Sequence, residues 1–259
     1  MRVCDSHCHL DFSEFDQDRE VVLAACRRQG VAAIVVPGVS AAGWPGLVDL
    51  CARDPLLHPA LGLHPMFLHQ HQTGDLERLD QWVRRQRPVA VGEIGLDFYL
   101  RETDRARQQD LFLAQLEIAR SHALPVILHV RKAHDEVLAC LRRVPVAGGI
   151  VHAFSGSRQQ AEHYIELGFA VGFGGVLTYP NARRVRQLAR ELPLASIVLE
   201  TDAPDMAPAG RHGERNSPLN VLLVLDELAR IREEDRAQIA QITTQNVEKL
   251  LNIVTEVGY

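Results

Sequence analysis

The first ten residues hold a dense group of side chains that could bind a metal. The run Asp5-Ser6-His7-Cys8-His9 follows a short β-rich segment. Side chains alternate along an extended chain, so His7 and His9 can point the same way while Cys8 points to the opposite side. Two imidazoles at the end of a strand make a good pair of metal ligands. A single His-x-His pair occurs often by chance, so the rest of the chain must support this interpretation.

Further residues of the ligand type end later apolar runs, namely His64, Glu93, His129, His152 and Asp202. If these runs are parallel strands of a barrel, their ends meet at one rim, where active sites of such barrels lie. Four histidines and two carboxylates then converge: His7, His9, Glu93, His129, His152 and Asp202. This set is sufficient for two divalent ions, with Glu93 as a bridge between them. For His64 alone, a packing role and a functional role are equally compatible with the sequence.

The elements that must position these residues alternate along the chain. The apolar runs predict strands at Val3–His7, Val31–Val36, His58–Leu63, Pro88–Gly92, Pro125–His129, Gly149–Ala153, Ala170–Phe173 and Ile197–Thr201. Amphipathic patterns predict helices at Asp18–Gln29, Gly46–Ala52, Leu76–Gln86, Arg105–Ser121, Asp135–Arg143, Arg158–Leu167, Arg183–Glu191, Leu219–Arg230 and Glu234–Leu251.

The strands read as continuous apolar runs, as in residues 32–36, which is typical of parallel strands buried on both faces. Eight strand–helix units within 259 residues favour the α/β class and a single (β/α)8 TIM barrel that spans residues 1–259 as one domain. An open, doubly wound sheet is the alternative.

Composition restricts the partners. The formal net charge is -5, whereas a protein that coats duplex DNA is normally basic. Aromatic residues make up only 5% of the chain, too few to favour a stacking platform for long single strands. A nucleic-acid substrate therefore requires few, local contacts, with metal ions supplying positive charge.

Five cysteines without a CxxC pair favour a reduced, cytoplasmic protein. The N-terminal residues lack the apolar run of a signal peptide, and we expect no membrane-spanning segment. The oligomeric state stays open, and a monomer is compatible with the sequence.

Three motifs carry a family resemblance. Asp5-Ser6-His7-Cys8-His9, Gly92-Glu93-Ile94-Gly95-Leu96-Asp97 and Leu199-Glu200-Thr201-Asp202-Ala203-Pro204 resemble the signatures of the TatD family of metal-dependent deoxyribonucleases. The stretch from Pro193 to Met206 is most similar to the YjjV-like branch of that family. The resemblance implies a metallo-dependent hydrolase barrel of the amidohydrolase superfamily.

The resemblance also implies roles for the candidate ligands. One metal would be held by His7, His9, Glu93 and Asp202, and the second by Glu93, His129 and His152. Asp202 would act as a catalytic residue as well, taking the proton of the attacking water. Metal coordination lowers the pKa of water to about 7, which makes hydroxide available at neutral pH.

Glu93 stands where many superfamily relatives place a carboxylated lysine. The only lysines are Lys132 and Lys249, and neither is at this position, so a carboxylate bridge fits the sequence. Imidazole ligands favour two ions drawn from Zn, Mn, Fe or Ni, although Mg or Mn could act at a weak second site.

The resemblance further suggests that Arg131 and His134 contact a substrate phosphate and that His64 contacts the scissile phosphate. Arginine suits phosphate because its planar fork donates two parallel hydrogen bonds. The alternative for Arg131 is an ion pair with a carboxylate on the barrel rim. Two other segments are expected to be structural: the glycine-rich Gly172–Gly175 turn and the Asn216-Ser217-Pro218 element.

Three functions compete on these grounds. The leading hypothesis is an exonuclease that hydrolyses phosphodiesters at the ends of single-stranded DNA, which it would bind as a substrate without forming a stable complex. The second is hydrolysis of another ester or amide bond, such as an aminoacyl-nucleotide linkage, because fold and metals fix the reaction class more firmly than the substrate. The third is a metal-binding protein without activity, which the intact ligand set disfavours.

Overall fold

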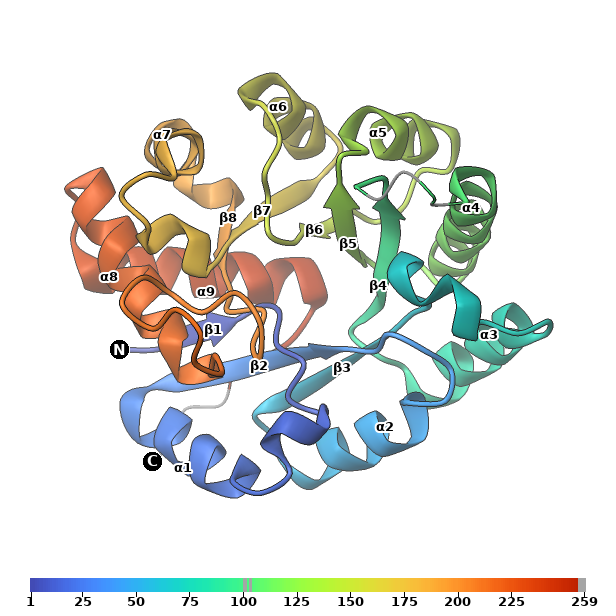
Figure 1. Cartoon of the computed structure of the whole chain (residues 1–259), viewed down its shortest axis with the longest axis horizontal. Helices are drawn as coiled ribbons and strands as arrows, with labels where there is room; N and C mark the ends of the chain where they lie inside the picture. The colour runs from blue at the N-terminus through green and yellow to red at the C-terminus, as the bar shows by residue number, and fades with distance from the viewer. Residues whose placement is uncertain (100–101, 103, 256–259) are drawn as a thin grey trace.

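Eight parallel strands form one sheet in which every strand pairs with its neighbours in chain order. The computed structural model describes residues 1–99, 102 and 104–255. The strands are β1 (Val3–Asp5), β2 (Val31–Pro37), β3 (Leu57–Leu61), β4 (Ala90–Asp97), β5 (Val126–Arg131), β6 (Gly149–Val151), β7 (Phe169–Phe173) and β8 (Ile197–Leu199). Figure 1 shows these strands around the centre of the molecule, with most helices outside them.

The α-helices are α1 (Arg19–Gln29), α2 (Trp44–Arg53), α3 (Asp75–Gln86), α4 (Arg105–Ser121), α5 (His134–Arg143), α6 (Arg158–Glu166), α7 (Arg183–Glu191), α8 (Val221–Arg232) and α9 (Arg236–Leu251). Short 3-10 turns are η1 (Ser13–Phe15), η2 (Pro65–Gln70), η3 (Gly175–Thr178), η4 (Leu194–Ser196) and η5 (Pro218–Asn220). The predicted TIM barrel is therefore confirmed, and the open sheet is excluded by the closure described next.

Hydrogen bonds between the segments at the carboxyl ends of β1 and β8 close the ring. Ser6 N donates to Leu199 O at 2.9 Å, and Asp202 N donates to His7 O at 2.8 Å. The buried Asp5 carboxylate also accepts hydrogen bonds from the backbone N–H and the hydroxyl of Thr201, at 3.0 and 2.5 Å. We call these Asp5–Thr201 contacts the closing staple, because they join segments almost 200 residues apart.

The inside of the barrel has its own apolar core, which α9 completes. Small side chains project inward from the strands, among them Ala33, Ala60, Ala90 and Ala170. They pack against Val247 and Leu251 of α9 and against Ile253, which follows that helix. In Figure 1, α9 passes behind the ring of strands, at the end where the strands begin. Helix α9 thus plugs the amino-terminal end of the barrel.

Most predicted boundaries lie within a few residues of the observed ones, but the end of β4 was wrong. The sequence predicts that this strand ends at Gly92, with Glu93 directly after it. In the structure β4 continues to Asp97, with a shift of register between Val91 and Ile94. Gly95 permits this, since a Cβ there would lie 2.0 Å from the carbonyl oxygen of His129 on β5. Glu93 is consequently part of the strand.

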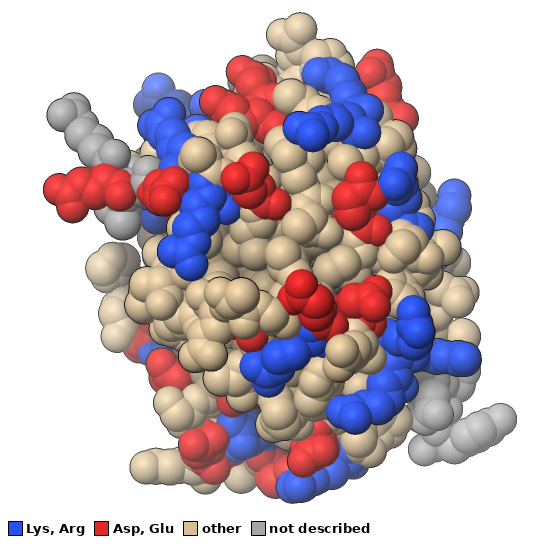
Figure 2. Space-filling model, turned by 90° about the vertical axis from the view of Figure 1, so that its right-hand side faces the viewer, with Lys and Arg blue, Asp and Glu red and all other residues tan. Residues whose placement is uncertain are grey.

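The surface carries both signs of charge. On the face seen in Figure 2, basic and acidic side chains are interspersed, and the coloured residues there form no continuous basic stripe. Of the helices described, none combines the length and apolar character that crossing a bilayer requires.

Candidate metal centre

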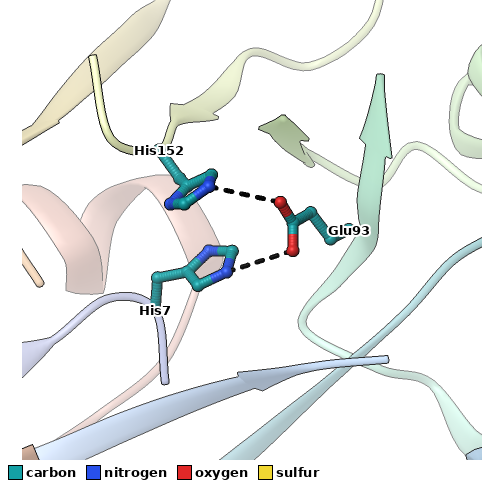
Figure 3. Close-up of side chains that lie close together, drawn as sticks. All are labelled: His7, Glu93 and His152. Carbon is teal, nitrogen blue, oxygen red and sulfur yellow. Dashed lines mark ion pairs between the residues drawn. The ribbon is translucent and has the colours of Figure 1, made fainter. Parts of the chain in front are cut away.

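Glu93 lies at the middle of a cluster of imidazoles at the carboxyl end of the barrel. The side chain is 1% exposed, and five histidine nitrogens approach its two oxygens. Oε2 lies 3.2 Å from His7 Nε2 and 3.4 Å from His9 Nε2, whereas Oε1 lies 3.1 Å from His64 Nε2, 2.9 Å from His129 Nδ1 and 3.3 Å from His152 Nε2. Figure 3 shows His7 and His152 converging on opposite oxygens of the carboxylate that β4 projects inward.

Asp202 stands at the edge of this cluster. Its Oδ1 lies 3.5 Å from His7 Nε2 and 3.7 Å from His9 Nε2, and its side chain is 16% exposed, more than that of Glu93. The structure therefore brings together all six residues that the sequence singled out as converging ligands. It adds His64, whose ring joins Glu93 and His129 in a group compact enough to hold an ion.

His7 and His9 lie just beyond the end of β1. The expected alternation holds there: both rings face Glu93, while Cys8 Sγ lies 3.6 Å from the carbonyl oxygen of Ala203. His9 Nδ1 also lies 3.2 Å from the carbonyl oxygen of Pro37, which fixes the ring with Nε2 toward the cluster.

Two further carboxylates support the imidazoles from behind. Asp97 Oδ2 lies 3.0 Å from His129 Nε2, which leaves Nδ1 of that ring facing Glu93. Glu200 Oε1 lies 3.4 Å from His152 Nδ1 and accepts a hydrogen bond of 2.6 Å from Ala153 N. Both acids belong to the sequence motifs that contain Glu93 and Asp202, but the sequence alone assigns them no role. Their position at strand ends, in the same motifs as Glu93 and Asp202, was the available signal.

Burial and charge divide the histidines into two groups. Burial lowers the pKa of His7 well below its ordinary range and that of His64 to about 4, so both rings are neutral. Burial also opposes charge on His9 and His152, but nearby carboxylates, with Glu93 the strongest, raise their pKa values to about 9 and about 10.

The two central carboxylates also differ. The pKa of Glu93 is held well below its ordinary value despite burial, because His64, His7 and His152 surround it. Burial raises the pKa of Asp202 to about 6, against the opposing effect of His152 and His9. Glu93 is thus an anion throughout the physiological range, and Asp202 is the acid of the cluster able to exchange a proton near neutral pH.

The donor set fits divalent metal ions. His7 Nε2 and His9 Nε2 face each other at 3.3 Å, an arrangement in which at most one proton can lie between them. Without cations, protons held on His9 and His152 must balance the buried carboxylates. Three compact groups of ligand atoms share these residues: His7, Glu93 and His152; His7, His9 and Asp202; and His64, Glu93 and His129. Imidazole with carboxylate is the donor chemistry of transition-metal sites.

Four of the eight non-glycine residues with positive φ angles among the described residues lie around the same centre. Lys132, Ala153, Asp202 and Met206 have positive φ angles between 44° and 56°. Such conformations are uncommon outside glycine, and they cluster at functional sites where the surrounding structure enforces them. Here they turn the chain sharply just after β5, β6 and β8, so that side chains at the strand ends face inward.

The predicted phosphate contacts lie on the rim. Arg131 ends β5 with its side chain 47% exposed, and its guanidinium lies 3.7 Å from the ring centre of Tyr99 and 4.0 Å from Asp97 Oδ2. The ion-pair alternative for Arg131 is therefore present only as a long contact. His134 begins α5 and is buried, and burial lowers its pKa to about 4, so it can act only as a neutral group.

The two segments expected to be structural pack tightly. A Cβ on Gly172 would lie 2.2 Å from Glu200 Oε2, and one on Gly175 would lie 2.1 Å from the carbonyl oxygen of Met206. Asn216 is 1% exposed, and its amide donates to the carbonyl oxygens of Thr201 and Asp205. The side chain of Asn216 thereby fastens the loop that follows β8.

A barrel that gathers imidazoles and carboxylates at the carboxyl ends of its strands is of the metallo-dependent hydrolase type. The family described as TatD related DNase matches residues 4–252. The chain is 42% identical to YjjV of Escherichia coli K12, named an uncharacterized metal-dependent hydrolase, over 97% of this chain and 98% of that protein. The chain therefore belongs to the TatD family of metal-dependent hydrolases.

Two solved structures and a further relative are also similar to this chain. The crystal structure of the Escherichia coli YjjV protein superimposes with a TM-score of 0.95, over 98% of this chain and 99% of that one. A zebrafish relative named "Putative deoxyribonuclease tatdn3" is 30% identical over 96% of each chain. A mutant organophosphorus hydrolase from Deinococcus radiodurans, 13% identical, superimposes with a TM-score of 0.68 over 96% of this chain and 92% of that one, which shows a shared fold alone.

Proposed function

We propose that this protein is a deoxyribonuclease that hydrolyses phosphodiesters at the ends of single-stranded DNA. The observation that carries the proposal is the Glu93 carboxylate, buried among five imidazoles with Asp202 at the open edge. The family description and the name of the zebrafish relative favour a DNA substrate.

As the family resemblance implies, His7, His9, Glu93 and Asp202 would hold one divalent ion, and Glu93, His129 and His152 the second, with His64 as an added candidate ligand beside Glu93. Zn, Mn, Fe and Ni suit the imidazoles, and Mg remains compatible with a weaker site. When bound, the ions would supply Lewis acidity that polarises the phosphoryl group and makes water a better nucleophile at neutral pH.

The residues of the chain do the remaining work. Asp202 accepts the proton of the attacking water, since its pKa of about 6 leaves it mostly ionised at pH 7 while keeping it a useful base. On the rim, the exposed fork of Arg131 binds a phosphate oxygen. His64, if it does not bind a metal, and the neutral His134 contribute hydrogen bonds to the substrate.

The experiment is release of mononucleotides from single-stranded DNA labelled at its 5′ or 3′ end. The enzyme is stripped with chelator and reloaded with Mg, Mn or Zn, with Glu93→Ala as the inactive variant and Glu162→Ala, a half-exposed glutamate on α6, as the matched control. We expect metal-dependent release that Glu93→Ala abolishes and Glu162→Ala preserves. No release from protein shown to hold the ions would refute the nuclease proposal and favour hydrolysis of another ester or amide bond at this centre.

A further inference from the structure

A cavity of about 500 Å³ opens directly beside the metal centre. One edge of it is formed by His129, His152 and Asp202. Much of the remaining wall is apolar and comes from five different segments: Val130, Phe154, Phe173, Val176, Val185 and Met206. We call this space the apolar chamber. A substrate bond held at the metal centre has one of its substituents facing this wall, and the volume is sufficient for a group of nucleoside size.

The charges around the chamber select against a second phosphate. Apart from the metal centre, its ionisable lining groups are Arg131 and Asp205, which carry opposite charges. A phosphate placed against the apolar wall, away from Arg131, would lose its water without a matching cation. An uncharged, flat group loses little on entering, because its faces contact Phe and Val side chains.

A second hollow of different chemistry adjoins the chamber. This polar groove, of about 540 Å³, shares Arg131 and Ser155 with the chamber. Two more cations, Lys132 and Arg184, line it, along with Asp135 and Glu136. Its wall is mostly polar. Arg131 and Ser155 thus mark a boundary. On one side of it the surface is apolar, and on the other side it is polar and carries cations.

We infer that the chamber binds the nucleobase of a terminal nucleotide, while the rest of the strand leaves over the polar groove. This inference rests on the proposed function and deepens it. An internal nucleotide has a phosphate on each side, and with its base in the chamber one of these would have to lie against the apolar wall. A terminal nucleotide has only one linkage to place at the metal centre. The chamber therefore accounts for action at the ends of DNA strands, because it excludes the second phosphate that an internal nucleotide carries.

The test compares ligands that differ only in the base. Thymidine 5′-monophosphate and 2-deoxyribose 5-phosphate share the sugar and phosphate, and calorimetry with Mn-loaded protein measures the affinity of each. A base stacked on protein side chains contributes about 1–3 kcal/mol, which corresponds to about 5–150-fold, so we expect the nucleotide to bind on the order of tenfold more tightly. A parallel assay measures kcat/KM for oligonucleotides ending in a normal or an abasic residue.

Two substitutions place a carboxylate on the chamber wall. Val176→Asp on η3 and Val185→Asp on α7 change half-buried positions from different elements, so that one remains informative if the other fails to fold. The matched control is Val21→Asp on α1, a residue that is 68% exposed. We expect each chamber variant to remove the advantage of the nucleotide over the sugar phosphate while leaving the affinity for the sugar phosphate within about twofold. The control should keep the full difference.

The outcomes separate this inference from the proposed function. Equal binding of the two ligands, no binding of either, or a tenfold difference that survives in both folded chamber variants would overturn the base subsite. Cleavage of DNA with equal kcat/KM for normal and abasic ends would overturn it too, while leaving the nuclease intact. Base-dependent binding that the variants remove, without cleavage of any DNA, would support the subsite and refute the nuclease.

Discussion

The two ends of the barrel differ in the chemistry of the side chains that meet there. At the amino-terminal end, small apolar side chains of the strands meet Val247 and Leu251 of α9, and this inner core holds the barrel together. At the carboxyl end, imidazoles and carboxylates gather in compact groups, with the apolar chamber beside them. The difference assigns stability to one end and chemistry to the other, the division expected of such barrels.

Small residues serve both ends, for different reasons. Ala33, Ala60 and Ala170 leave room at the amino-terminal end for the side chains of α9. Gly95 and Gly172 at the carboxyl end leave room for polar atoms, the His129 carbonyl and the Glu200 carboxylate. Small residues thus make room for the apolar side chains of α9 at the amino-terminal end and for the polar groups that support the ligands at the carboxyl end.

The largest effect should come from removing the central charge at the carboxyl end. Glu93→Gln keeps the shape of the side chain but leaves five imidazoles without their shared anion. We expect hydrolytic activity to fall by about a thousandfold or more. Bound metal, measured by elemental analysis after gel filtration, should fall with it, while the protein stays folded by circular dichroism. Full metal content in this variant would contradict the assigned centre.

At the opposite end, truncation of the plug should affect stability alone. Leu251 is 2% exposed. Leu251→Ala deletes buried methyl groups and should lower the free energy of unfolding by about 2–5 kcal/mol, measured by urea denaturation. Activity per folded molecule and metal content should equal those of the wild type. If the metal affinity fell as well, the separation of roles between the two ends would be wrong.

Metal uptake should depend strongly on pH. The pKa values of His9 and His152, raised to about 9 and about 10, mean that both rings hold protons at pH 7 in the absence of metal. Binding must displace those protons, so affinity should rise with pH up to these values, by about tenfold per pH unit for each proton released. Below about pH 6, protonation of Asp202 should weaken binding further. Competition with a chromophoric chelator between pH 6 and 8 measures this slope, and a flat profile would contradict it.

The smallest effect should come from removing a carboxylate that holds one of the candidate ligands in place. Asp97→Asn leaves His129 without the anion that fixes its Nε2–H, and loss of such an outer partner typically costs about 10–100-fold in metal affinity. Asp54→Asn is the control, because Asp54 is equally buried but lies at the amino-terminal end of β3, paired with Arg27. Chelator competition should separate the two variants. Equal metal affinities of the two variants would show that Asp97 has only a structural role.

The sequence allowed the fold and the converging ligands to be predicted for physical reasons. Parallel strands buried on both faces give apolar runs, and the polar residues that end those runs must meet at one rim. His152 and Asp202 followed from this rule although the predicted ends of β6 and β8 were each two residues too late. The rule tolerates such errors because it needs only the order of the elements.

Other features depend on details that no run of residues reveals. Glu93 lies inside β4, where the register against β5 shifts between Val91 and Ile94, whereas the sequence predicts that the strand ends at Gly92. The supports Asp97 and Glu200 act through ring orientations that only coordinates define. The apolar chamber is likewise assembled from five segments, so no local pattern predicts it.

The closing staple ties folding to the completion of the centre. Asp5 and Thr201 are two residues and one residue away from His7 and Asp202 along the chain, so the hydrogen bonds that close the ring also bring His7 and Asp202 together. A chain that has formed seven strands but has not closed cannot present both His7 and Asp202. Metal therefore binds the finished ring in preference to its open precursors, and by mass action it draws the chain toward closure. In a cell, the supply of the ion would act as a folding aid as well as a catalytic one.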